Sequence, residues 1–248
     1  MTRILILGDV HGAFSRINQL ICRMRPELII QCGDFGYFPE EIRMESLSQR
    51  WVRPFDPAFA VKNVLSSGKR IPIYWCDGNH EHFPTLFSKW KEAGGRVEPL
   101  EVGPEMYYMP RGSTLELPSG EKVCFLGGAR SVDRPLRVRG QTWFPEEMLA
   151  TDVLDVLPEK ADMVISHTAP WSFDITKTVT DPVCDEWDMT PDTSRDVLEQ
   201  VLRRLKPLRW YFAHFHISRK GQSQGCDWTA LSDLGSQGPG RSWVWHPQ

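Results

Sequence analysis

The feature that most constrains the fold is a short apolar stretch near the start of the chain, residues 4–7, that stops abruptly at polar side chains. Asp9 and His11 follow it two positions apart, within the run Gly8-Asp9-Val10-His11-Gly12. Residues i and i+2 of a strand project from the same face, so the carboxylate and the imidazole leave the strand end in the same direction. An oxygen ligand beside a nitrogen ligand is half of a metal site.

The same arrangement recurs further along the chain. Residues 13–24 carry apolar side chains at three- and four-residue spacing, which predicts an amphipathic helix. Residues 28–32 predict a buried strand that again ends in a glycine and a carboxylate, Gly33 and Asp34. Because a strand, a helix and a second strand form a βαβ unit, we expect a parallel sheet and an α/β fold.

Three later apolar stretches also run into polar residues, and we expect strands at 71–76, 162–166 and 209–213. The helical patterns between them cover residues 57–67, 84–93, 145–157 and 193–206. Short strands of a second, antiparallel sheet are expected at 106–109, 113–117 and 122–126, and in the tail at 227–232 and 242–246. Since no repeat, low-complexity tract or linker interrupts the pattern, we expect one domain over residues 1–248.

Five expected strand ends carry side chains that can bind a metal ion. These are Asp9, His11, Asp34, Asn79, His80, His167, His214 and His216. A single histidine at a strand end is more often a hydrogen-bonded structural residue than a ligand. Five strand ends of this kind would, however, all meet at the sheet edge where open α/β folds bind ligands, and this coincidence favours a site.

The residue types indicate the chemistry of that site. Mixed carboxylate and imidazole ligation favours manganese, iron or zinc over calcium or a thiolate site. The potential ligands are too many for one open metal position. Two ions about 3.5–4 Å apart, bridged by a carboxylate, would lower the pKa of bound water and hold both the attacking and the leaving oxygen of a phosphoryl transfer. The sequence therefore predicts a dinuclear hydrolase.

The order of the motifs resembles the calcineurin-like metallophosphoesterase family over residues 4–216. The motifs are Gly-Asp-x-His-Gly, Gly-Asp, Gly-Asn-His-Glu, a lone His and His-x-His. The resemblance implies a four-layer α/β/β/α fold, in which a two-sheet β-sandwich is flanked by helices and the metal site lies at the carboxyl ends of the strands.

The resemblance also assigns roles. Three side chains would hold each of two divalent ions, Asp9, His11 and His216 the first, and Asn79, His167 and His214 the second. Asp34 would bridge the ions, of which manganese is the first expectation and iron, zinc, nickel or magnesium the alternatives. His80 would not be a ligand. It would act beside the phosphate as a general acid or transition-state stabiliser while a bridging hydroxide attacks phosphorus.

Some positions depart from the patterns of the superfamily. Ala213 stands where the last motif usually begins with glycine. Phosphoprotein phosphatases carry an Asp-Arg pair where this chain has Tyr37 and Phe38, and an arginine where it has Asp77. These changes weaken the case for a protein serine/threonine phosphatase.

The basic loop at residues 130–139 offers other arginines that could hold the phosphate, because one guanidinium group can donate two parallel hydrogen bonds to phosphate oxygens. We expect Arg134 or Arg137 to contact the substrate. The alternative is a solvated basic loop paired with nearby acids such as Asp133.

The leading function is the hydrolysis of a phosphomonoester or phosphodiester. The alternative enzyme is a nuclease or nucleotide phosphodiesterase with the same centre, so that nucleic acid enters only as a substrate. The formal charge of −3 offers it no broad phosphate-binding surface. A third alternative is an interaction scaffold, since a few proteins of this fold have lost catalytic residues. All seven ligands and His80 are present here, which disfavours it.

The sequence also indicates where the protein works. The six cysteines form no CxxC pair, and several lie in apolar runs, which is typical of buried reduced thiols. No apolar run has the length of a membrane span, and the residues before the first motif are too few for a signal peptide. We expect a cytoplasmic protein without a membrane partner.

Overall fold

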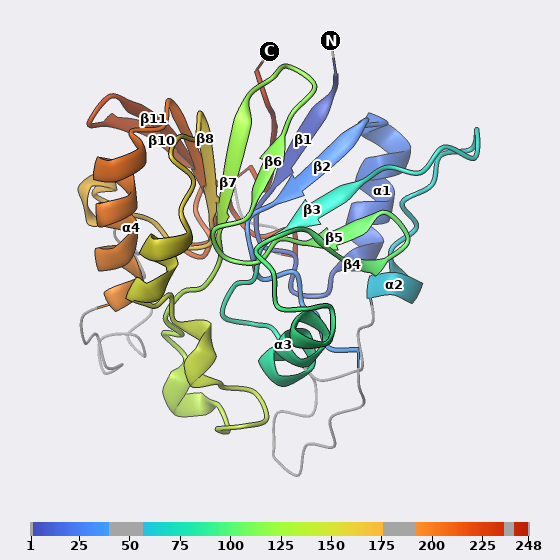
Figure 1. Cartoon of the computed structure of the whole chain (residues 1–248). Coiled ribbons are helices and arrows are strands. Elements are labelled where there is room, and N and C mark those ends of the chain that lie inside the picture. Colours follow the sequence, from blue (N-terminus) through green and yellow to red (C-terminus); the bar gives the residue numbers. More distant parts are fainter. Residues whose placement is uncertain (1, 40–56, 176–191, 236–240, 248) are drawn as a thin grey trace.

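The computed structural model describes residues 2–39, 57–175, 192–235 and 241–247, and within them two mixed sheets of six strands each (Figure 1). The first sheet has the order β12 (Trp243–Trp245), β1 (Ile4–Leu7), β2 (Leu28–Gln31), β3 (Ile73–Trp75), β5 (Met106–Tyr108) and β4 (Leu100–Gly103). The second has the order β10 (Arg219–Ser223), β11 (Cys226–Ala230), β9 (Arg209–Phe212), β8 (Met163–Ser166), β7 (Lys122–Leu126) and β6 (Thr114–Glu116). In each sheet four central strands run parallel and the edge strands run antiparallel to them.

The two faces of the strands build different layers. In β1, Ile4 and Ile6 pack with Phe125 and Ile165 of the second sheet, between the sheets. The alternate residues of β1 pack outward against helix α1 (Phe14–Met24). Because successive side chains of a strand point to opposite faces, one apolar strand can supply both layers.

The outer layers are helical. Figure 1 shows α1 and α4 (Thr193–Leu205) on the outer sides of the two sheets. Asp192 caps the start of helix α4, because its side chain accepts a hydrogen bond from the Ser194 amide at 3.0 Å. Its apolar face, which includes Val197 and Val201, packs in one cluster with Val164 of β8. The predicted four-layer α/β/β/α sandwich is therefore confirmed.

Two expected helices are shorter or of another kind. Helix α2 (Pro57–Ala60) covers only the start of the pattern at 57–67. The buried amide of Asn63 donates to the carbonyls of Ile71 and Pro104, at 3.0 and 2.8 Å. These contacts tie Asn63 to the segments before β3 and β5, and the chain continues into an isolated bridge between Val64 and Arg70.

The segment at 145–157 folds into two 3₁₀ turns, η2 (Pro145–Glu147) and η3 (Thr151–Val156). The Arg111 guanidinium takes the carbonyls of Glu146, Glu147 and Met148, at 2.8, 3.3 and 2.7 Å. An α-helix would need those carbonyls as acceptors for its own amides. The remaining long helix, α3 (Phe83–Glu92), lies within two residues of its expected place.

Strand partners differ from the expectation in both sheets. β5 was expected in the antiparallel second sheet, but it pairs parallel with β3 in the first sheet. β12 likewise belongs to the first sheet, beside β1. The second sheet is also less antiparallel than expected. β6 pairs antiparallel with β7, but β7 pairs parallel with β8, and β11 pairs parallel with β9. Within the described residues, no helix has the length and apolar character that crossing a bilayer requires.

Candidate metal centre

The strand ends that were expected to carry ligands come together, but they belong to two sheets and not to one as expected: β1, β2 and β3 to the first sheet, β8 and β9 to the second. Asp9 and His11 follow β1, Asp34 follows β2, and the remaining candidates follow β3, β8 and β9. Four candidate ligands have left-handed backbone, which is uncommon outside glycine: His11 (φ 47°), Asp34 (53°), His214 (64°) and His216 (51°). Such conformations concentrate at functional sites, where surrounding contacts hold them.

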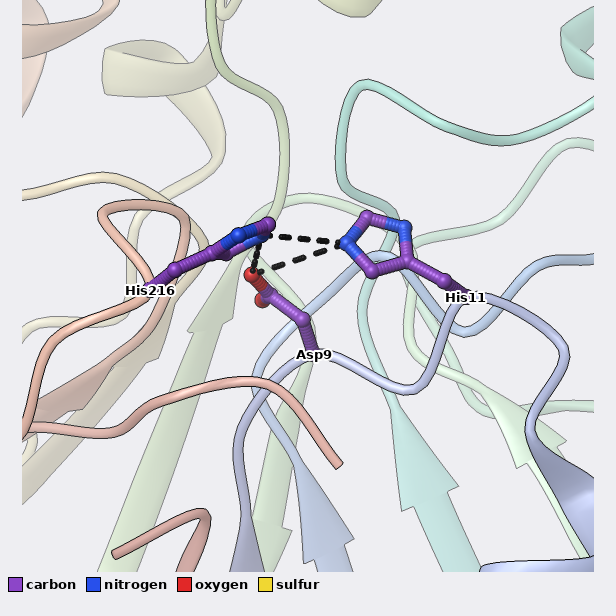
Figure 2. A group of neighbouring side chains, drawn as sticks. All are labelled: Asp9, His11 and His216. Atoms are coloured by element: carbon purple, nitrogen blue, oxygen red, sulfur yellow. Dashed lines mark hydrogen bonds and ion pairs between the residues drawn. The ribbon is translucent and has the colours of Figure 1, made fainter. Parts of the chain in front are cut away.

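Asp9, His11 and His216 point toward one another (Figure 2). Oδ2 of Asp9 lies 2.9 Å from Nε2 of His216, which in turn lies 3.1 Å from Nε2 of His11. Ligand atoms about 2.1 Å from one ion, at right angles to each other, lie about 3 Å apart. The Asp9 carboxylate is fully buried and its Oδ2 accepts no hydrogen bond. A buried anionic oxygen beside two ring nitrogens fits a divalent cation.

A second group forms around His167, which is fully buried. Its Nδ1 donates to the carbonyl of Cys32 at 2.9 Å, which leaves the lone pair of Nε2 free, as in metal-binding histidines. Nε2 lies 3.0 Å from Oδ1 of Asn79 and 3.3 Å from Oδ2 of Asp34. Three electron-pair donors thus converge. Burial lowers the pKa of His167, but the negative charges of Asp34 and Asp9 outweigh burial and raise this pKa to about 9. The electrostatic potential of the two carboxylates therefore favours a cation at this position.

Asp34 lies between the two groups. Its Oδ2 is 3.3 Å from Nε2 of His167 and 3.7 Å from Nδ1 of His11. Its Oδ1 accepts the backbone amides of Asn79 and His80, both at 2.7 Å. Burial raises the pKa of Asp34, but the neighbouring imidazoles, above all that of His167, outweigh it and hold the pKa well below its usual 3.8.

His214 is placed beside this second group by its backbone and its ring. Its amide donates to Oδ1 of Asp9 at 3.2 Å. Its ring centre lies 4.9 Å from that of His167. The His-x-His motif thus delivers His214 toward His167 and His216 toward His11 and Asp9.

His80 and Arg137 contact each other at the mouth of the site. The His80 side chain is 36% exposed, so a substrate can reach it. A terminal nitrogen of Arg137 lies 2.8 Å from Nδ1 of His80 and also contacts Nε2. Arg137 is held from behind by Asp133 at 2.8 Å and by the carbonyl of Asn79 at 3.0 Å. Partial burial lowers the pKa of His80, and Arg137 lowers it further against the attraction of Asp34.

Arg134 is placed differently from Arg137. It is exposed, and its guanidinium lies over the ring of Trp143, 4.3 Å from the ring centre. The expected pairing of the loop with Asp133 is also present, since this acid holds Arg137. Of the two arginines expected to contact a substrate, the structure thus brings Arg137 to His80 and leaves Arg134 on the surface.

Glu81 is a site residue to which the sequence pattern assigned no role. Its buried carboxylate accepts three successive backbone amides, those of Phe35 at 2.7 Å, Gly36 at 3.1 Å and Tyr37 at 2.6 Å. It therefore fixes the loop that follows Asp34. The sequence indicated Glu81 only through its place in the Gly-Asn-His-Glu motif. That motif does not predict which backbone amides donate to its carboxylate.

The chain is similar to known proteins in its sequence pattern and in its fold. The family model described as calcineurin-like phosphoesterase matches residues 2–218. Among solved structures, the chain is similar to GAP50, described as the anchor in the inner membrane complex of Plasmodium. The identity is 10%, the match covers 94% of this chain and 72% of that one, and the TM-score is 0.50.

It is also similar to the phosphopantetheinyl hydrolase PptH of Mycobacterium tuberculosis, with 12% identity, 94% and 90% coverage and a TM-score of 0.46. At such identities the likeness to GAP50 concerns the fold alone, and the likeness to PptH carries no argument. No curated protein matches the chain. The family model spans most of the sequence and every strand end described above, and the chain therefore belongs to the calcineurin-like phosphoesterase family.

Proposed function

We propose that this protein hydrolyses phosphoric esters with two divalent metal ions, acting on a phosphomonoester or a phosphodiester. Membership of the family and the ligand clusters support metal-dependent phosphoesterase chemistry in general. The observation that carries the more specific proposal is the position of Asp34. Its Oδ2 lies within 3.7 Å of ring nitrogens from both groups, where a carboxylate shared by two ions would lie.

The proposal assigns three side chains to each ion, Asp9, His11 and His216 to one, and Asn79, His167 and His214 to the other. Asp34 is shared between them. Manganese suits this mixed oxygen and nitrogen set, and iron, zinc, nickel and magnesium are the alternatives. When bound, such a pair of ions lowers the pKa of water and neutralises charge on the phosphate oxygens.

The chain itself supplies orientation and further charge. Asp34 is fixed by the Asn79 and His80 amides at its other oxygen, so it can turn Oδ2 toward the site without losing these bonds. Arg137 brings a positive charge next to the exposed edge of His80. We therefore assign His80, supported by Arg137, to the stabilisation of charge on the phosphate in the transition state. Arg134, on the surface of the same loop, is assigned to a more distant part of the substrate.

The location in the cytoplasm belongs to the same proposal. The described cysteines, Cys22, Cys32, Cys76, Cys124 and Cys226, are all free, and Cys184 lies outside the described residues. Free buried thiols suit a reducing compartment.

Hydrolysis assays test the function. Metal-free protein would be reconstituted with Mn²⁺, Zn²⁺, Ni²⁺ or Mg²⁺ and assayed against p-nitrophenyl phosphate and bis-p-nitrophenyl phosphate. We expect activity with at least one ion, and its loss in His80→Ala and Asp34→Asn. Protein that binds two ions and hydrolyses neither ester with any of them would contradict the proposal and favour an interaction scaffold. A preference for the diester would identify a phosphodiesterase.

A further inference from the structure

Glu147 is a buried carboxylate that the proposed chemistry does not use. It is 1% exposed and follows the basic loop that carries Arg137. Its Oε1 accepts the backbone amide of Ser131 at 2.8 Å and the indole N–H of Trp143 at 2.9 Å. Its Oε2 accepts the hydroxyl of Ser131 at 2.6 Å. Burying a carboxylate is costly without such partners. These contacts also fix which group donates and which accepts in the hydrogen bonds around Glu147.

A chain of hydrogen bonds connects Glu147 through Ser131 to Asn79. A hydroxyl has one proton, and an ionised carboxylate can only accept, so Ser131 must donate its proton to Glu147. Its oxygen then offers Asn79 only a lone pair. Of the two amide atoms of Asn79, only Nδ2 can donate to that lone pair, and it lies 3.0 Å from Oγ of Ser131. The carbonyl oxygen is consequently turned the other way, 3.0 Å from Nε2 of His167.

We infer that Glu147 is a positioning residue of the metal centre, which acts through Ser131 to fix the Asn79 amide with its oxygen facing the ion. This inference rests on the proposed function, because that function makes Asn79 a ligand. The opposite amide orientation would present an NH₂ group, which cannot bind a cation. The relay therefore decides whether Asn79 is a ligand at all.

Glutamine at position 147 would reverse the relay. Its NH₂ group can donate to Ser131, so the hydroxyl is released to donate its proton to Asn79, and the amide then turns its oxygen away from His167. The size of Glu147 is retained while the polarity changes. Residues that orient ligands in this way typically change metal affinity about 10- to 100-fold when substituted.

The test is a titration of metal-free protein with Mn²⁺ by isothermal calorimetry. For Glu147→Gln we expect the ion assigned to Asn79, His167 and His214 to bind roughly 10- to 100-fold more weakly. The affinity of the other ion should not change. Glu146→Gln is the matched control, because this neighbouring side chain is exposed, and it should bind both ions as wild type does. Circular dichroism of each variant checks that the fold is kept.

The titration is repeated in the Asn79→Asp background, with and without Glu147→Gln. This comparison separates an effect on the orientation of the Asn79 amide from a general loss of structure. A carboxylate offers an oxygen on either side, so the Glu147→Gln change should then no longer weaken the binding of this ion. Equal weakening in both backgrounds, or no weakening in either, would overturn the inference. Wild-type protein that binds fewer than two ions would refute the proposed function and the inference together. Two ions without hydrolysis would refute the function alone.

Discussion

Oε2 of Glu81 accepts the backbone amide of Tyr37 at 2.6 Å, so the loop after β3 holds the loop after β2. The reverse contact runs from the Asn79 and His80 amides to Oδ1 of Asp34. Two neighbouring strand ends thus fix each other through buried carboxylates. A methyl group at Gly78 would clash with the Asp34 carboxylate, so the glycine allows this close approach.

Replacing Glu81 with alanine should destabilise the fold. The change leaves three buried amides without an acceptor, and each such group costs about 1–3 kcal/mol. We expect the free energy of unfolding, measured in urea, to fall by about 3 kcal/mol or more. Glu98→Ala, at an exposed acid, should change it by no more than about 0.5 kcal/mol. A similar small change in Glu81→Ala would show that the loop is held by other contacts.

Asp9→Ala should empty or weaken one metal position and leave the other occupied. The change removes Oδ2, the oxygen assigned to the ion, and it also takes one acceptor, Oδ1, from the backbone amide of His214. Elemental analysis of dialysed protein should give about one ion per chain in place of two, with an unchanged circular dichroism spectrum. Two ions bound at normal affinity would overturn the assignment of Asp9.

Arg137→Ala should lower kcat/KM by roughly 100- to 1,000-fold with normal metal content, since the loss of one donor to developing charge costs about that much. Arg137→Lys keeps the charge but loses the planar fork, and should recover part of the activity. Arg134→Ala serves as the comparison on the same loop and should act mainly on KM for larger substrates. Unchanged kinetics for p-nitrophenyl phosphate in both alanine variants would rule out a clamp in this loop.

The C-terminal strand is tied down by an acid-sensitive contact. Glu121 accepts from Nε2 of His246 at 3.0 Å and from Arg209 at 2.5 Å. Burial raises the pKa of Glu121, but its hydrogen bonds to His246 and Ser119 outweigh burial and lower it below the usual 4.5. The stabilisation that a lowered pKa provides is fully present at pH values above the pKa of the unfolded state. It is lost as the pH falls through the pKa of the folded state.

Glu121→Gln should therefore destabilise the protein at pH 7 and remove part of the stability loss below about pH 4.5. Urea unfolding at pH 3.5 to 7 measures this. If the variant and the wild type lost stability in parallel over that range, the contact would contribute nothing. The tie matters because His246 follows β12 and Glu121 precedes β7, so it joins the two sheets.

The strand ends and the candidate ligands at them could be predicted from the sequence because each is a local pattern. An apolar run that stops at glycine and a polar residue, such as Gly8 and Asp9, specifies a strand and its functional end together. The partner of a strand is not local. β5 joins β3 rather than the second sheet, and its residues carry no mark of that choice.

The missed features depend on contacts between distant residues. The expected helix at 145–157 is replaced by 3₁₀ turns at 145–147 and 151–156, and Arg111 donates hydrogen bonds to the carbonyls of Glu146, Glu147 and Met148 at the first of them. The relay from Glu147 to Asn79 spans three segments of the chain. Local periodicity cannot reveal either, whereas the histidines that line the centre were visible as soon as the strand ends were placed at one edge.

The most direct measurement is an anomalous difference map at the manganese absorption edge from crystals soaked in MnCl₂. The account predicts two peaks, one among Asp9, His11 and His216 and one beside Asn79 and His167, with Asp34 between them and the peaks about 3.5–4 Å apart. A single peak, or two peaks that Asp34 does not bridge, would contradict the dinuclear centre.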